Sequence, residues 1–250
     1  YPMIVAGCYF GITPWNMNRL SMDESDFSFA ILLFGIFFII SNQIAGRMLV
    51  PKYGTKLIMS LAFPIVTFAT LLSVISPSYF YFLLSFIPLG IGWGASGPIG
   101  GIHSQLIEQH FKKIITPYYA MGFNIGILVG GALAGIIMRN NYEPYLSFFI
   151  LSFLSIFVSF FVYSFGLPRN LDFKGKGEKF KIPETNVLLF GLLLFFVFGS
   201  GGIIMDWSTL WLSKDLNTPL YLASMGLIFF SIGGIFANLF SNSLINLFSE

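Results

Sequence analysis

A single acid, Asp206, stands well inside an apolar segment of this chain, between Ile203-Ile204-Met205 and Trp207. Ionisable side chains at membrane depth are expensive and are therefore a default sign of function. Burial also favours the neutral form of a carboxyl group, so that such an acid can bind and release a proton. Asp206 is accordingly the first candidate for proton coupling. Because it lies near one end of the segment, a water-exposed and simply ionised acid is the alternative.

Polar and aromatic side chains in other apolar segments could complete a binding site. An indole ring can stack on a sugar or an aromatic ligand, and an amide can orient hydroxyl groups. The candidate substrate-binding residues are Trp15, Asn16, Trp93, Asn124, Asp206 and Trp207. Each has an alternative role, since Trp207 could belong to an interfacial aromatic belt and Trp93 or Asn124 to a helix–helix contact.

One cation could act together with the acid. Arg19 lies near the end of the first apolar segment and could pair with Asp206, closing one end of a cavity. The two residues are therefore candidates for gating or proton coupling. In the alternative interpretation, Arg19 merely interacts with the nearby acids Asp23 and Glu24.

The composition determines the class of protein that must position these residues. Hydrophobic residues make up 56% of the 250 positions and charged residues only 10%, with a mean hydropathy of +0.81. A soluble domain needs a more polar exterior, so the sequence predicts an all-α membrane protein. The net charge of +2 gives no indication of a nucleic-acid partner. One cysteine, two histidines and the absence of nucleotide- and metal-binding motifs predict no cofactor and no metal site.

Eight apolar segments are long enough to cross a bilayer, which takes about 20 helical residues. They cover residues 1–18, 26–49, 55–75, 78–106, 114–138, 145–167, 187–212 and 218–248. Most Lys and Arg residues follow the second, fourth and sixth segments, and the positive-inside rule assigns that side to the cytoplasm. We therefore expect a multi-pass protein of the inner membrane with both ends of this chain in the cytoplasm.

Glycines are unusually frequent between Gly90 and Gly135, many of them three or four residues apart. Glycine costs a helix about 1 kcal/mol relative to alanine, but in lipid small residues let two helices approach closely. Two interpretations follow. The helices pack closely around a small polar cavity, as in a transporter, or the glycines serve packing alone.

The longest polar stretch, residues 168–186, mixes glycine with charge and lacks apolar periodicity. It predicts a flexible cytoplasmic linker, although its basic residues could also contact anionic lipid. The linker would separate a six-helix unit, residues 1–167, from a two-helix unit, residues 187–250.

The loop after the second segment reads Gly46-Arg47-Met48-Leu49-Val50-Pro51-Lys52-Tyr53-Gly54-Thr55-Lys56. It resembles the signature loop of the major facilitator superfamily, whose members have two six-helix halves joined by a cytoplasmic linker. The matching positions are Gly46, Arg47, Lys52, Gly54 and Lys56. Val50 or Pro51 stands where the family pattern has an acid, which puts the ion pair attributed to that acid in doubt.

Within the superfamily, the chain is similar to the branch of fucose–proton symporters. The similar stretches are Leu89 to Gly101, Met121 to Gly135 and Asp206-Trp207-Ser208. A faint internal repeat also pairs the first segment with the seventh and the second with the eighth. The resemblance implies a six-helix half followed by the first two helices of its twin, and hence a fragment with eight of twelve spans.

The resemblance predicts a monomeric secondary transporter in membrane lipid and not an enzyme. It would move a small polar organic solute by alternating access, with a sugar as first candidate and protons as the candidate coupling ion. One alternative is an integral-membrane lipid-modifying enzyme, which would need His, Asp or Glu clustered at one membrane face. The other is a non-transporting membrane receptor.

Overall fold

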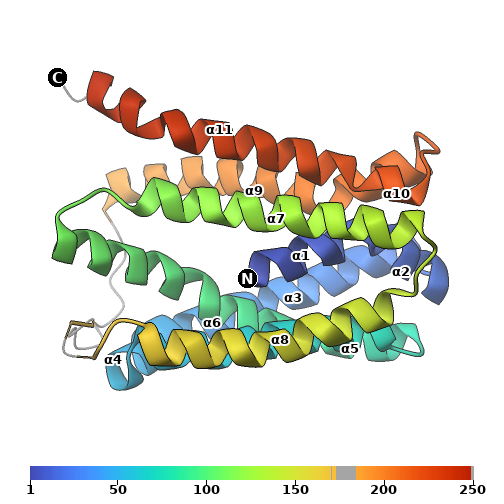
Figure 1. Cartoon of the computed structure of the whole chain (residues 1–250), viewed down its shortest axis with the longest axis horizontal. Coiled ribbons are helices and arrows are strands. Elements are labelled where there is room, and N and C mark those ends of the chain that lie inside the picture. The colour runs from blue at the N-terminus through green and yellow to red at the C-terminus, as the bar shows by residue number, and fades with distance from the viewer. Residues whose placement is uncertain (170, 173–183, 249–250) are drawn as a thin grey trace.

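The computed structural model describes residues 1–169, 171–172 and 184–248, and these form helices joined by short connections (Figure 1). The predicted all-α fold is confirmed. In order the helices are α1 (Pro2–Gly11), α2 (Thr13–Leu20), α3 (Glu24–Ile44), the π-helix η1 (Ala45–Leu49), α4 (Val50–Tyr53), α5 (Thr55–Ile75), α6 (Tyr79–Phe111), α7 (Thr116–Arg139), α8 (Pro144–Phe165), α9 (Thr185–Lys214), α10 (Leu220–Ala223) and α11 (Met225–Phe248).

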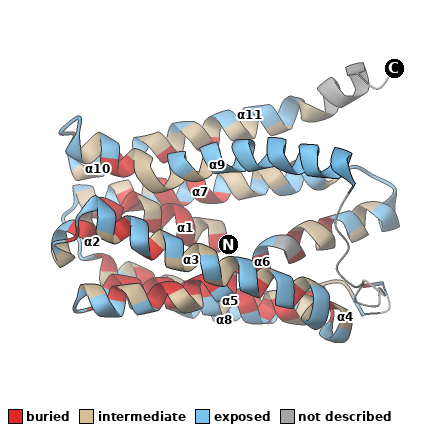
Figure 2. Cartoon of the chain, turned by 180° about the vertical axis from the view of Figure 1, so that it is seen from behind, coloured by how far each residue is buried: buried red, intermediate tan, exposed pale blue. Residues whose placement is uncertain are grey.

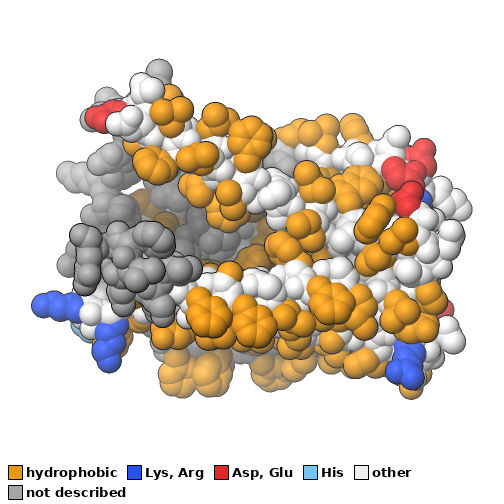
Figure 3. Space-filling model, turned by 90° about the horizontal axis from the view of Figure 1, so that it is seen from above, with side chains coloured by type: hydrophobic (Ala, Val, Ile, Leu, Met, Phe, Trp, Pro, Cys, Tyr) orange, Lys and Arg blue, Asp and Glu red, His pale blue; other side chains and the backbone are white. Residues whose placement is uncertain are grey.

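Seven stretches of helix in the described residues are long and apolar enough to cross a membrane. They run side by side along one axis, and the bundle has two distinct ends (Figure 1). We call the end that carries α4 the linker end and the end that carries α2 the α2 end. Charged side chains lie at these two ends, and hydrophobic side chains cover the flank between them (Figure 3). The prediction of a multi-pass membrane protein is confirmed.

The predicted first span, residues 1–18, is not one helix but two short ones, α1 and α2, which meet at Ile12. Proline explains the break. Pro14 has no N–H group, so it cannot donate to the carbonyl of Phe10 one turn earlier. The hydroxyl of Thr209 in α9 donates to that carbonyl instead, at 2.9 Å. The break therefore gives a distant helix a polar docking point inside the bundle.

The other predicted segments agree with the observed helices more closely. The predicted segment 55–75 has the same bounds as α5, and the later ones differ by a few residues at their ends. The second segment continues through η1 and α4 to Tyr53, and the eighth is divided into α10 and α11.

Glycines bring α1 and α7 into close contact. A Cβ atom added to Gly7 would lie 2.8 Å from the Cα atom of Ile127, and one added to Gly130 would overlap the backbone of Ile4. Real Cβ atoms essentially never approach that closely. The two helices can pack at this distance because neither carries a side chain at these points.

The same packing joins α6 to α3. A Cβ atom on Gly90 would lie 2.5 Å from the Phe34 carbonyl oxygen, and one on Gly94 would lie 2.9 Å from the Cβ atom of Ser41. At Gly122, by contrast, an added Cβ atom would meet nothing within 4 Å. The packing interpretation therefore accounts for much of the glycine-rich stretch.

Buried residues are distributed unevenly among the described helices. Buried residues concentrate in α1, α2 and α5, whereas α9 is exposed over most of its length (Figure 2). Every residue of α9 from Thr185 to Ser200 is exposed, and the helix becomes half-buried from Gly201 onward. Thus α9 contacts the first six spans mainly toward the α2 end.

The close α1–α7 contact predicts that Gly130→Ala destabilises the protein by about 1–3 kcal/mol, because an added methyl group forces two backbones apart. The midpoint of thermal unfolding in detergent measures the effect. Gly122→Ala on the same helix is the matched control and is expected to change stability by less than about 0.5 kcal/mol. Equal midpoints for the two variants would contradict the packing role of Gly130.

Candidate functional site

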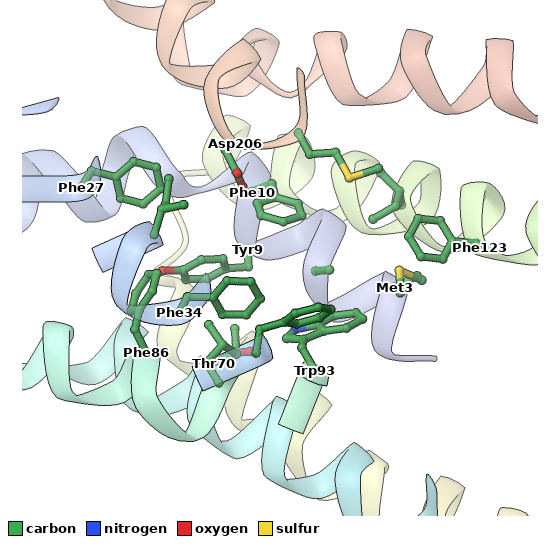
Figure 4. A pocket seen from close by; sticks show the side chains of 16 residues that line it. Met3, Tyr9, Phe10, Phe27, Phe34, Thr70, Phe86, Trp93, Phe123 and Asp206 are labelled. Atoms are coloured by element: carbon green, nitrogen blue, oxygen red, sulfur yellow. The ribbon is translucent and has the colours of Figure 1, made fainter. Parts of the chain in front are cut away.

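A cavity of about 220 Å³ lies inside the bundle. Half of its sixteen lining residues are aromatic (Figure 4). Six helices each contribute at least one side chain, namely Tyr9 from α1, Phe34 from α3, Thr70 from α5, Trp93 from α6, Phe123 from α7 and Asp206 from α9. The cavity is therefore lined jointly by five of the first six spans, all except α8, and by α9.

Asp206 supplies the one formal charge among the described residues that line the cavity. Its side chain projects from α9 toward Phe10 (Figure 4). It is half-buried, and within the described part of the chain no hydrogen bond or ion pair to its carboxylate is found. The acid that the sequence singled out thus lies at a cavity without a protein counter-charge.

Trp93 reaches the same cavity from α6, on the opposite side from Asp206 in the view of Figure 4. Its ring is partly buried against the main core cluster. Of the six predicted substrate-binding residues, Trp93 and Asp206 line this cavity. The structure brings these two together from helices more than a hundred residues apart.

Asn124 and Trp207 lie at helix–helix contacts instead. The Asn124 amide donates to the carbonyl of Ala120 at 3.0 Å, and its oxygen would lie 2.5 Å from a Cβ atom on Gly234 of α11. The Trp207 ring packs edge-on against Phe27 of α3, with 5.7 Å between the ring centroids.

Trp15, Asn16 and Arg19 form a separate cluster at the α2 end. The Arg19 guanidinium donates to the Asn16 side-chain oxygen at 2.8 Å and to the carbonyl of Ser76, just beyond α5, at 2.5 Å. It also lies over the Trp15 ring, 5.3 Å from its centroid. The structure therefore does not bring Arg19 to Asp206, because Arg19 is bound to the end of α5.

Sequence analysis missed most of the aromatic lining. Phe34, Phe86 and Phe123 resemble the many other Phe residues of apolar segments, which face lipid or pack in the core. A usable signal was available for Tyr9 and Thr70, since hydroxyl groups within apolar spans need partners. Thr70 donates its hydroxyl to the carbonyl of Val66 at 2.8 Å, one turn back along α5.

The loop that resembles a family signature forms the linker end of the bundle. Gly46 and Arg47 lie in η1, and Lys52 lies in α4. Gly54 has φ = +86°, a conformation that glycine adopts without the steric cost other residues incur. Lys56 in α5 places its ammonium group 5.3 Å from the centroid of the Tyr163 ring.

A carboxylate from outside the loop completes it. Asp172, within the predicted linker, accepts hydrogen bonds from the backbone N–H and the hydroxyl of Thr55, at 2.6 and 3.0 Å. A side chain on Gly54 would collide with this carboxylate, since an added Cβ atom would lie 2.6 Å from it. Asp172 therefore caps the N-terminus of α5.

Two further contacts hold this region. Nδ1 of His103 in α6 lies 3.1 Å from the Thr55 hydroxyl, and the Arg169 guanidinium donates to the carbonyl of Lys52. The start of the predicted linker is therefore bound to the first six spans. The prediction of flexibility falls on residues 170 and 173–183, which lie outside the described residues.

The family model of the Major Facilitator Superfamily matches residues 3–249. The chain belongs to the major facilitator superfamily. It is also similar to an uncharacterized MFS-type transporter of Yersinia pestis, with 20% identity over 240 residues. The match covers 94% of this chain and 61% of that relative, so the chain spans less than two thirds of its length.

Membership of the superfamily and the seven apolar helices of the described residues make this a multi-pass membrane protein. The cavity between the first six spans and α9 is accordingly a candidate solute site. The more specific resemblance to fucose–proton symporters and the prediction of a fragment stay predictions.

The cap on α5 predicts that Asp172→Ala lowers the free energy of unfolding by about 1 kcal/mol, because the first turn of α5 loses its hydrogen-bond acceptor. Thermal unfolding in detergent measures the change. Glu184→Ala is the matched control, since Glu184 is the N-cap residue of α9 but makes no side-chain cap bond. A loss of stability in the control as large as that in Asp172→Ala would argue against a specific cap.

Proposed function

We propose that this protein is a secondary transporter that binds its solute in the cavity at Trp93 and Asp206 and carries it by alternating access. In this proposal, residues 1–167 form one half of the transporter, residues 168–186 connect the halves, and residues 187–250 begin the second half. The observation that carries the proposal is the cavity itself, because one wall comes from α9 and the others come from the first six spans.

Contacts at the α2 end support a state that is closed there. Besides the bond from Thr209 to the Phe10 carbonyl, Lys214 at the end of α9 pairs with Glu24 of α3 at 2.6 Å. The stretch Thr185–Ser200 toward the linker end is exposed in the described structure. Contact of α9 with the first spans at the α2 end, with an exposed stretch of α9 toward the linker end, is an asymmetry that rocking about a central site requires, while α11 packs against α7.

The charge distribution supports an orientation for this state. The linker end carries Arg47, Lys52, Lys56 and Arg169, so the positive-inside rule favours the cytoplasmic side for it. The α2 end would then face outward from the inner membrane, and the protein would be closed to the outside. In this proposal Arg19, held by Trp15 and Asn16 against α5, stabilises the outer closure, and the transporter works as a monomer.

Asp206 is the candidate for proton coupling. A carboxylate beside an aromatic cavity and without a counter-charge is stabilised when it binds a proton. The sugar predicted from the sequence would stack on Trp93. An apolar lining offers few hydrogen-bond partners for hydroxyl groups, however, and unpaired hydroxyl groups are costly to bury.

Proton coupling predicts that Asp206→Asn removes the effect of a pH gradient on solute flux, because an amide cannot exchange the proton. Flux into proteoliposomes is measured with and without the gradient, using the intact protein. Asp215→Asn, an exposed acid at the end of the same helix, serves as the control and is expected to keep the effect. Unchanged gradient-driven flux in Asp206→Asn would remove the proton-carrier role.

Closure at the α2 end predicts that Thr209→Val shifts the population toward a form open at that end. Loss of one buried hydrogen bond, worth about 1 kcal/mol, corresponds to about a fivefold change in the population ratio. Pulsed electron paramagnetic resonance between spin labels on α2 and α10 measures the distances. Glu24→Gln removes an exposed ion pair and is expected to shift the ratio less. A distance distribution unchanged by Thr209→Val would contradict this closure.

A further inference from the structure

The cavity combines many ring faces with one carboxylate. Tyr9, Phe10, Phe34, Trp93 and Phe123 are among its lining residues, and they approach the cavity from several directions in Figure 4. The ring faces of aromatic residues are negative and attract cations. The Asp206 carboxylate and the aromatic rings therefore both favour a positively charged ligand.

Of the cations at the α2 end, Arg139 at the end of α7 is exposed, and Arg19 and Lys214 are engaged elsewhere. Arg19 donates to Asn16 and Ser76, and Lys214 pairs with Glu24. The Tyr9 hydroxyl points away from Asp206 in Figure 4. Within the described residues, no hydrogen bond or ion pair from a protein group compensates the charge that Asp206 carries when it is ionised.

A carboxylate at a site of low polarity is costly when it stands alone. A proton or a cationic ligand would neutralise it, whereas an anionic ligand would add repulsion. A neutral polyol would bury several hydroxyl groups among rings that cannot pair with them. The cavity volume of about 220 Å³ lies below the range of about 300–1,000 Å³ that is typical of pockets for drug-sized ligands. A small ligand therefore fits this cavity best.

We propose that the cavity binds a small organic monocation with an aromatic or branched apolar body, its ammonium group at Asp206 and its body among the rings. This inference rests on the proposed transport function and names the class of solute. One carboxylate cannot hold a proton and an organic cation together. Proton and solute therefore exclude each other at Asp206, and coupling through this residue is an exchange of one for the other.

The test compares three small probes on the intact purified protein by equilibrium dialysis. Benzyltrimethylammonium carries a permanent charge on a one-ring body, phenylacetate is an anion with a similar body, and D-glucose represents the neutral polyols. The affinity for benzyltrimethylammonium is expected to exceed that for each of the other two probes by about tenfold or more. Binding of glucose or phenylacetate as tight as that of the cation would overturn the proposal.

Variants of Asp206 and Asp215 then test which carboxylate is the counter-charge of the bound cation. Asp206→Asn is expected to weaken binding of benzyltrimethylammonium about tenfold or more, because the cation loses its partner. Asp206→Glu keeps the charge and should retain most of the affinity, and Asp215→Asn on the same helix should bind like the wild type. Unchanged cation affinity in Asp206→Asn, or equal loss in all three variants, would contradict the assignment.

The spin-label distances between α2 and α10 separate this inference from the transport function. A protein that exchanges between two forms but does not bind the cation would refute the solute class and leave alternating access intact. A protein that binds the cation at Asp206 but neither changes form nor mediates flux would refute the transport function and leave the binding site intact.

Discussion

In a bilayer, backbone carbonyls must find their hydrogen-bond partners inside the protein, and the Phe10 carbonyl at the break in the first span finds one of its partners on α9. Pro14 cannot supply the N–H that would complete the helix. The Phe10 carbonyl accepts a backbone N–H at the end of α1, and the hydroxyl of Thr209 donates to it from α9. Because Asp206 lies one turn earlier on α9, the same contact brings its carboxylate to the cavity. The kink in the first span and the position of Asp206 at the cavity thus depend on the same hydrogen bond.

The two sides of the cavity are held in different ways. Within the first six spans, glycines such as Gly94 and Gly130 let backbones touch, and such closely packed contacts resist sliding because interiors of this density deform little. The contacts of α9 with these spans are fewer and include a hydrogen bond, a ring pair, an exposed ion pair and the burial of Leu210 in the main core cluster. Weaker attachment of α9 to the tightly packed first six spans is consistent with rocking about a central site.

At the linker end, a carboxylate from outside the loop binds the start of α5. The loop from Gly46 to Lys56 keeps its glycines and bases but has Val50 or Pro51 where the family pattern has an acid. Asp172, more than a hundred residues later, places a carboxylate at the N-terminus of α5. A helix N-terminus attracts negative charge from wherever the chain can provide it. Asp172 also fastens the start of the predicted linker to α5.

Local patterns determined the membrane class, the approximate bounds of most of the helices, and Asp206 as the acid of interest, because hydropathy and the cost of a charge in lipid are properties of short stretches. The break at Ile12 was also encoded locally by Pro14, although the length of the apolar run concealed it. Only the tertiary structure decided that Trp93 and Asp206 share a cavity while Asn124 and Trp207 pack between helices, and that Arg19 binds the end of α5. Nothing in a single apolar helix distinguishes a ring that faces a cavity from one that faces lipid. That distinction is made by which helices pack together, and packing depends on side chains that are far apart in the sequence.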